Sequence, residues 1–244
     1  RGRLIRKAFI ARDENYTLLS ADYSQIELRI IAALSGEENM IKAFQNNEDI
    51  HRSTAAKVFN VPLGDVTKEQ RSNAKTVNFG IIYGVSAFGL SNQTSLSRKE
   101  SAELIDAYYA TYPKLKSYMS GQVDFARENG YVQTVLGRRR YLKDINSANM
   151  MVKSGAERNA VNAPIQGSAA DIIKMAMIEV DKILPKEQST LLLQVHDELV
   201  FEADVEIADE LAKQIAEVMQ SVLEISANCA ERAQNSRPAQ SARG

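Results

Sequence analysis

The chain has 244 residues, of which 44% are hydrophobic and 25% charged, and its formal net charge at pH 7 is −1. Such a chain can bury a substantial core, as one large domain or two smaller ones. No apolar run approaches the roughly 20 residues that cross a bilayer, and the sequence opens without a signal-peptide pattern, so we expect no membrane partner. The net charge does not itself point to a nucleic acid, although local clusters of Lys and Arg could bind phosphates. The single cysteine, Cys229, excludes an internal disulfide and fits a reducing cytoplasm.

The first predicted strand ends at an acidic residue. Residues 16–21 are mostly apolar, aromatic or β-branched, which predicts a strand followed by Asp22. Ser24 and Glu27 then form the S-x-x-E pattern of a helix capping box, with apolar residues at helical spacing up to Gly36. Asp22 therefore lies between a strand and a helix, where rigid scaffolds often present working residues. From the residues alone, Glu27 is either a capping side chain or part of a site.

Short helices with polar faces are expected over residues 37–66, and they contain His51, a residue type that is more often structural or solvated than functional when it stands alone. The next helix is more informative. A capping box at Thr67 and Gln70 opens it, and Gly84 can end it. Four side chains recur on it at intervals of four: Arg71, Lys75, Phe79 and Tyr83.

Two cations followed by two aromatic rings on one helix face could bind a nucleotide, because the cations suit phosphates and the rings suit a sugar and a base. The same pattern also describes an amphipathic helix with core aromatics and solvated cations. Gly80 and Gly84 favour the site, since a glycine inside a helix costs roughly 1 kcal/mol relative to Ala and indicates close approach or bending.

The second half of the chain is predicted to be mostly helical. Two helices are expected between Ser97 and Gly130, followed by a hairpin whose tip carries the arginines 138–140. A helix is expected over residues 147–162, with a break at Pro164 and a second helix over 169–184. Arg158 and Asn162 share a face of the first of these helices at i,i+4, and Gln166 lies just beyond the expected break. A long amphipathic helix is predicted over 205–225.

Two apolar runs, 191–195 and 199–201, flank His196, Asp197 and Glu198, which predicts a β-hairpin with a charged tip. Two adjacent carboxylates repel each other, and Mg²⁺, which prefers oxygen ligands, is a common way to neutralise them. A polar surface turn is the alternative interpretation of this stretch taken alone.

Three of these stretches together resemble motifs A, B and C of the bacterial DNA polymerase I family, family A: residues 22–29 (DYSQIELR), 71–84 and 194–198 (QVHDE). They occur in the family's order and with its spacing, and the similarity extends from about Gly2 to Ile225. The resemblance implies an α+β fold of right-hand polymerase architecture, with an antiparallel β-sheet palm at 1–35 and 147–226 and helical fingers at 36–146. The family's thumb is expected to be absent. Residues 227–244 depart from the family's pattern and are expected to be disordered.

The resemblance also implies roles for the residues that match the family's motifs. Asp22 and Asp197 would hold two Mg²⁺ ions, with the Tyr23 carbonyl as a further ligand and Glu198 as an accessory carboxylate. The residues expected to bind the incoming deoxynucleoside triphosphate are Tyr23, Glu27, His51, Arg71, Lys75, Phe79 and Tyr83. Among these, Lys75 would protonate the leaving pyrophosphate and Glu27 would exclude a ribose 2′-hydroxyl. The residues expected to contact primer or template are Arg158, Asn162, Gln166, Gln194 and His196.

The function implied is a DNA-templated DNA polymerase that acts in replication and repair. Its expected partners are primer–template DNA and deoxynucleoside triphosphates, and the chain is expected to be a monomer in a bacterial cytoplasm, associated with the nucleoid. The alternative is a truncated, non-catalytic DNA-binding fragment of such a polymerase. A single-subunit RNA polymerase is disfavoured, because Glu27 would exclude its substrates.

Overall fold

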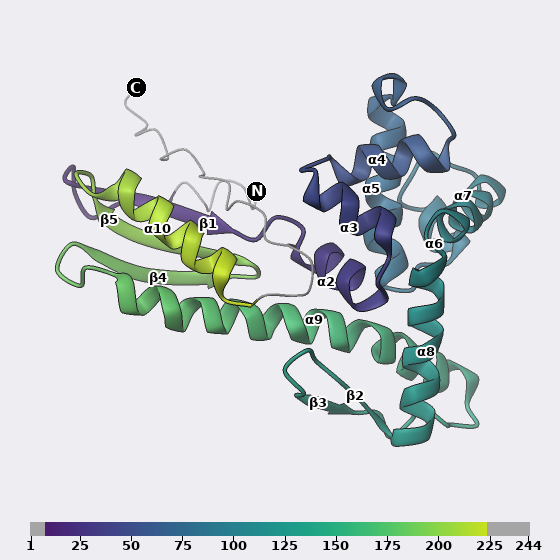
Figure 1. Cartoon of the computed structure of the whole chain (residues 1–244). Helices are drawn as coiled ribbons and strands as arrows, with labels where there is room; N and C mark the ends of the chain where they lie inside the picture. Colours follow the sequence, from purple (N-terminus) through teal and green to yellow (C-terminus); the bar gives the residue numbers. More distant parts are fainter. Residues whose placement is uncertain (1–7, 224–244) are drawn as a thin grey trace. The chain divides into compact units, whose positions relative to one another are not determined.

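The computed structural model describes residues 8–223, which form two compact units. The first unit contains residues 8–26 and 170–223 and is built on an antiparallel sheet. The second contains residues 27–169 and is mostly helical (Figure 1). This mixture of helices with an antiparallel sheet confirms the predicted α+β class. Within the described part of the chain, no helix is long and apolar enough to cross a membrane.

The sheet of the first unit has three strands in the order β1-β5-β4. β1 spans Tyr16–Asp22, β4 spans Ser189–Val195 and β5 spans Glu198–Asp204, and β5 pairs antiparallel with both neighbours. The predicted hairpin is confirmed, with His196 and Asp197 forming its turn between β4 and β5. The pairing of β1 with β5 sets Asp22 directly opposite Glu198, so two of the predicted acidic residues meet at one end of the sheet.

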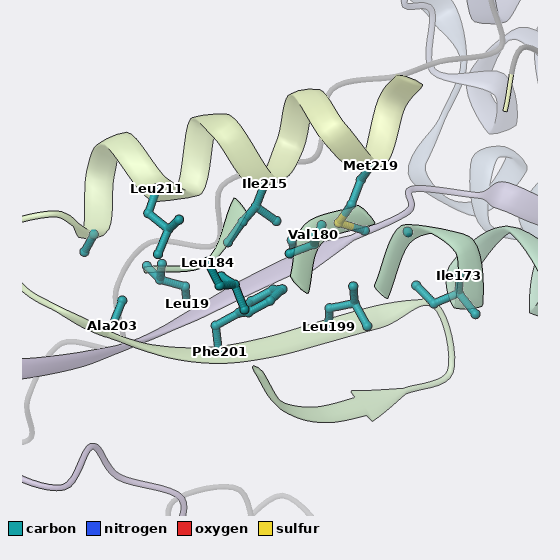
Figure 2. Close-up of a cluster of buried hydrophobic side chains, with 13 residues drawn as sticks. Leu19, Ile173, Val180, Leu184, Leu199, Phe201, Ala203, Leu211, Ile215 and Met219 are labelled. Carbon is teal, nitrogen blue, oxygen red and sulfur yellow. The ribbon is translucent and has the colours of Figure 1, made fainter. Parts of the chain in front are cut away.

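The core of the first unit lies between this sheet and two helices. α9 spans Met150–Ile183 and α10 spans Ala208–Ser221. Figure 2 shows side chains of α10, such as Leu211 and Ile215, directed toward Phe201 and Leu199 on β5. Phe201 is fully buried, and burial of a side chain of this size contributes roughly 1.5–3 kcal/mol. This packing holds the strand ends that carry the acidic residues.

The second unit begins within α2 (Ile26–Ser35) and continues through α3 (Glu38–Gln45), α4 (Ile50–Val58), the 3₁₀ turn η2 (Leu63–Asp65), α5 (Lys68–Ile82), α6 (Ala87–Ser91), α7 (Arg98–Thr111) and α8 (Pro113–Asn129). The short hairpin of β2 (Tyr131–Gln133) and β3 (Arg139–Tyr141) follows, and then the first part of α9. The capping box expected at the start of α5 is present, and α7 also opens with a capping box, formed by Ser97 and Glu100. Gly84 and Gly130 end α5 and α8 with positive φ angles of 70° and 76°, as predicted.

The break expected at Pro164 is wrong, because α9 runs without interruption from Met150 to Ile183. A proline inside a helix costs about 3 kcal/mol, because it removes a hydrogen bond to the preceding turn and its ring clashes with the carbonyl there. Apolar burial offsets that cost, since Ile165 and Ile172, which follow Pro164 in the helix, are almost fully buried. The hydroxyl of Ser168 also donates to the Pro164 carbonyl at 2.5 Å. Gln166 therefore lies in the same helix as Arg158 and Asn162.

The basic hairpin also differs from the prediction. Arg139 and Arg140 belong to strand β3, and of the three arginines only Arg138 lies in the loop between the strands. Arg139 lies over the ring of Tyr131, 4.4 Å from its centroid, so this cation is stacked on an aromatic ring instead of extending from a turn. The tail expected to be disordered, residues 227–244, lies outside the described residues.

Candidate active site

Three carboxylates gather where β1 and β5 meet. Asp22 is the last residue of β1, Glu198 is the first of β5 and faces Asp22 across the pair, and Asp197 precedes Glu198 in the hairpin turn. The backbone N–H of Tyr23 donates to the Asp197 carbonyl at 3.1 Å, which ties the residue after Asp22 to the turn. Strand register therefore brings together acidic residues that are far apart in the sequence.

The electrostatics of this cluster show in the ionisation of Asp22. Although Asp22 reaches solvent, the surrounding protein removes part of its hydration, and this, with the negative charges of Asp197 and Glu198, raises the pKa of Asp22 to about 6. Glu198 is held in place by the Ser20 hydroxyl, which donates to its carboxylate. Ser20 lies two residues before Asp22 on β1, on the same face of the strand.

The donor set suits a hard divalent cation. Among residues 8–223, no three Asp, Glu, His or Cys side chains are arranged to hold a metal ion by themselves. Mg²⁺ does not need such a set, because it keeps several waters and is usually bound by one or two carboxylates together with substrate phosphates. Asp22 and Asp197 offer such carboxylates, and a cation between them would relieve the repulsion that raises the pKa of Asp22.

Tyr23, Gln194 and His196 lie beside these carboxylates in the first unit. The Tyr23 hydroxyl donates to the Met219 carbonyl of α10 at 2.5 Å, and burial raises the pKa of this phenol. Gln194 donates through Nε2 to the His196 carbonyl at 2.9 Å, and His196 has a φ of 58°. The exposed side chains of Gln194 and His196 thus flank the turn that presents Asp197.

In the second unit, the two predicted cations of α5 differ in their partners. Arg71 Nε is 2.6 Å from Asp49 Oδ2, and Asp49 also accepts the backbone N–H groups of His51 and Arg52 as the N-cap of α4. Partial burial opposes the ionisation of Asp49, but these hydrogen bonds outweigh it and lower the pKa of its carboxyl. Lys75, one turn further along, is exposed and forms no ion pair with any described residue.

The rings of His51 and Phe79 lie next to each other. The two ring centroids are 5.7 Å apart, and His51 is only 3% exposed. Asn78 Nδ2 lies 3.0 Å from His51 Nδ1. Burial lowers the pKa of His51 to about 4; Asp49 opposes this shift, while Arg71 and Lys75 add to it. The imidazole is therefore neutral at pH 7.

Tyr83 and Glu27 form a direct contact. The Tyr83 hydroxyl donates to Glu27 Oε2 at 2.5 Å, across from the end of α5 to the start of α2. The capping pattern predicted that Glu27 would be the third residue of its helix. In the structure α2 begins at Ile26, after Gln25 with a φ of 59°, so Glu27 is the second residue. The Glu27 carboxylate is thus engaged by a residue of the predicted nucleotide face.

The two glycines of this region are explained by close contacts, as the sequence predicted. A Cβ on Gly80 would lie 2.7 Å from Val85 Cγ1, and one on Gly84 would lie 3.1 Å from Arg158 Cγ. Gly84 also has a positive φ, which disfavours other residues. Gly80 therefore lets the chain turn back at Val85, and Gly84 lets α9 approach the end of α5.

The predicted DNA-contacting residues of α9 line two cavities of the second unit. One, of about 240 Å³, is lined by Arg158, Asn162, Gly84 and their neighbours. Asn162 Oδ1 is buried there and has no hydrogen-bond partner among the described residues, whereas Arg158 donates to Ser154 Oγ at 3.0 Å. Gln166 is exposed and lines a smaller cavity with the basic hairpin. A buried, unpartnered amide oxygen indicates a place where a ligand can donate.

Sequence reasoning missed three residues that support this site: Ser20, Asp49 and Asn78. Asp49 carried a signal, because an aspartate before an apolar helix start is a typical N-cap. Ser20 could have been placed beside Asp22 by strand alternation. Asn78 gave no local signal, since its role depends on how α5 packs against α4.

The chain belongs to DNA polymerase family A, whose family model matches residues 1–234. It is 51% identical over 228 residues to DNA polymerase I of Streptococcus pneumoniae, an alignment that covers 92% of this chain and 26% of the relative. It is 53% identical over 203 residues to DNA polymerase I of Mycobacterium tuberculosis, covering 82% and 22%. The chain thus spans about a quarter of the length of the curated relatives it matches.

A solved structure is also similar. It is the POL domain of Pol1 from M. smegmatis in complex with DNA primer-template and dNTP, with a TM-score of 0.84 and 46% sequence identity. The match covers 91% of this chain and 40% of that chain. Fold and sequence therefore agree on the family.

Proposed function

We propose that this chain is the catalytic part of a DNA-templated DNA polymerase, which adds deoxynucleotides to a primer 3′-hydroxyl by two-metal phosphoryl transfer and releases pyrophosphate. The observation that carries the proposal is the cluster of Asp22, Asp197 and Glu198 at one end of the sheet, in a chain that belongs to family A. The complex of the M. smegmatis relative with primer-template DNA and dNTP supports the same two partners here. In this proposal, residues 1–35 and 147–226 form the palm, residues 36–146 form the fingers, and the chain acts as a monomer.

Asp22 and Asp197 would hold the two Mg²⁺ ions, with the Tyr23 carbonyl as a further ligand. As is general for polymerases, the bound ions would activate the attacking oxygen and stabilise charge on the transferred phosphoryl group. Glu198 would be an accessory carboxylate, kept in one orientation by the Ser20 hydroxyl. The bond from Tyr23 to Met219 and the packing of Phe201 would keep these ligands in place before substrate arrives.

The face of α5 would bind the incoming nucleotide. Lys75 is free of ion pairs within the described residues, so it could approach the triphosphate and protonate the leaving pyrophosphate. Arg71 would bind phosphate through a guanidinium that Asp49 orients, and His51 would add a neutral donor. Phe79, half buried against His51, would pack on the sugar.

Glu27 would exclude ribonucleotides by occupying the space of a 2′-hydroxyl, and its bond to Tyr83 would hold it in that position. Tyr83 itself would lie near the template base. The residues proposed to contact primer or template are Arg158, Asn162, Gln166, Gln194 and His196. The unpartnered Asn162 Oδ1 supports this for α9, because a buried acceptor costs about 1–3 kcal/mol until a donor reaches it.

The proposal is tested by measuring whether the template base selects the nucleotide that is added. Four primer–templates that differ only in the first unpaired template base are each incubated with the chain, Mg²⁺ and one deoxynucleotide at a time, and product length is measured. We expect each template to select its complementary nucleotide. Asp197→Asn should abolish extension, whereas Asp106→Asn, on the exposed face of α7, should not.

Two results would contradict the proposal. Extension that ignores the template base would indicate an untemplated transferase. Binding of primer–template without extension by the chain would favour the second candidate, a non-catalytic DNA-binding fragment.

A further inference from the structure

Four polar side chains form a hydrogen-bonded series in the interior of the second unit: His51, Asn78, Thr54 and Tyr112. The Tyr112 hydroxyl lies 3.0 Å from Thr54 Oγ1, Thr54 Oγ1 lies 3.3 Å from Asn78 Oδ1, and Asn78 Nδ2 lies 3.0 Å from His51 Nδ1. None of the four is more than 3% exposed. The series joins α4, α5 and the residue that follows α7, and it ends on a predicted nucleotide-binding residue.

The positions of the hydrogens in this series follow from counting donors. If Tyr112 donates to Thr54, Thr54 can donate to Asn78 Oδ1, and the amide N–H can donate to His51 Nδ1. If His51 Nδ1 is the donor, the Asn78 amide must be turned so that Oδ1 faces the ring and Nδ2 donates to Thr54 Oγ1. One of the two hydroxyl hydrogens, that of Thr54 or that of Tyr112, is then left with no acceptor among residues 8–223. Burying an unsatisfied hydroxyl costs about 1–3 kcal/mol. The first order is therefore favoured.

The favoured order determines the tautomer of His51. Because Nδ1 accepts from Asn78, the ring proton must reside on Nε2 as long as the imidazole is neutral. Nε2 has no partner among the described residues, and it is not among their fully buried unpartnered atoms, so it keeps some access to solvent. Burial disfavours the imidazolium most, and the neighbouring charges of Arg71 and Lys75 add to this effect although Asp49 opposes it. The ring thus offers one neutral N–H donor beside two cations.

We infer that Asn78 is a positioning residue, which fixes His51 as the neutral Nε2–H tautomer and so prepares a hydrogen-bond donor for a phosphate oxygen of the incoming nucleotide. The choice of ligand rests on the proposed function, but the tautomer does not. A neutral donor suits this place, because it adds a hydrogen bond to the phosphate without adding repulsion to Arg71 and Lys75. Thr54 and Tyr112 act through Asn78 by fixing the direction of its amide.

The direct test is nitrogen-15 NMR of labelled histidine at pH 7. The chain has only two histidines, so His196→Gln leaves the signals of His51 alone. We expect a neutral ring with the proton on Nε2 and a bare Nδ1. A proton on Nδ1, or an imidazolium, while Asn78 is unchanged would overturn the inference whether or not the chain is a polymerase.

Asn78→Asp provides the second test, because a carboxylate accepts but does not donate. This variant should move the ring proton to Nδ1 or produce the imidazolium. Asn73→Asp is the matched control, since Asn73 is also buried on α5 but forms no hydrogen bond with the His51 ring among the described residues. Asn73→Asp should leave the tautomer unchanged. An unchanged tautomer in a folded Asn78→Asp variant would contradict the positioning role.

Kinetics then connect the tautomer to the nucleotide. A hydrogen bond to a charged group is worth about 1.5–3 kcal/mol, so its loss should raise the KM for deoxynucleotide by roughly 10-fold or more. This rise should appear in Asn78→Asp where the ring proton has moved to Nδ1, whereas an imidazolium keeps the Nε2–H donor and should not raise the KM. Asn73→Asp should leave the KM unchanged. If the chain shows no extension, the NMR result still decides the tautomer. Failure of the proposed polymerase function can therefore be distinguished from failure of the inference about His51. A raised KM with an unchanged tautomer would count against the inference.

Discussion

Two tyrosines of the second unit allow a matched test of how this core is held together. Tyr108 and Tyr112 are both fully buried, and their ring centroids are 5.0 Å apart. Only Tyr112 uses its hydroxyl, in the bond with Thr54, whereas the Tyr108 hydroxyl has no hydrogen-bond partner among residues 8–223. The same change, Tyr to Phe, should therefore have opposite effects on stability at the two positions.

The magnitudes follow from the hydrogen bonds. Tyr112→Phe removes one made hydrogen bond, which should lower the free energy of unfolding by about 0.5–1.5 kcal/mol. Tyr108→Phe removes a buried hydroxyl that pays its desolvation cost without compensation, so it should raise the free energy of unfolding by about 1 kcal/mol. The difference between the variants should be about 2 kcal/mol, or several degrees in Tm for a chain of this size.

Urea denaturation of the three proteins gives this difference directly. Far-UV circular dichroism is the suitable signal, since the chain has no tryptophan and the tyrosines are being changed. The unchanged slope of free energy against urea would show that the unfolded states are comparable. Equal destabilisation by both changes would refute the reasoning, because it would mean that the Tyr108 hydroxyl has a partner as valuable as Thr54.

Three further predictions concern the Glu27–Tyr83 hydrogen bond, the proline inside α9 and the buried histidine of α4. Glu27→Ala should increase ribonucleotide incorporation, and Tyr83→Phe, which removes the bond that holds Glu27, should do so to a smaller degree; unchanged discrimination in a competition assay would count against the proposed role. Pro164→Ala should raise the free energy of unfolding by about 1–3 kcal/mol, because α9 is already continuous and the alanine restores an N–H donor; a less stable variant would show that the proline is required for packing. His51 takes up a proton near pH 6.5 when unfolded but only near pH 4 when folded, so the folded state should lose about 2 kcal/mol of stability as the pH falls from 7 to 5. His51→Gln should lack this part of the loss in parallel urea titrations, and an identical loss in both proteins would contradict the shift.

The elements that could be predicted from the sequence are those with local signals. The hairpin around Asp197, the strand ending at Asp22 and the capping box of α5 all depend on residues within a few positions of one another. The sequence also predicted that close approach of other atoms would require glycine at positions 80 and 84. It did not predict which residues make these contacts, Val85 and Arg158. Short-range chemistry therefore determined most of the element boundaries.

The errors arose where tertiary packing overrode a local rule. A proline often ends a helix, but burial of Ile165 and Ile172 keeps α9 continuous through Pro164. The same limit applies to the site. The pairing of Asp22 with Glu198, and the bond between Asn78 and His51, depend on elements that are distant in sequence, so no local pattern could show them.

The proposed metal site is best tested by the rate of single-nucleotide primer extension in Mg²⁺, compared among four proteins. The unsubstituted chain is measured beside Asp22→Asn, Asp197→Asn and Glu198→Gln. Loss of a metal ligand removes several kcal/mol of transition-state stabilisation, so the two aspartate variants should be slower by about 10³-fold or more. Glu198→Gln should lose far less, because its side chain is an accessory held by Ser20. Extension by either aspartate variant at close to the rate of the unsubstituted chain would contradict the proposed metal site.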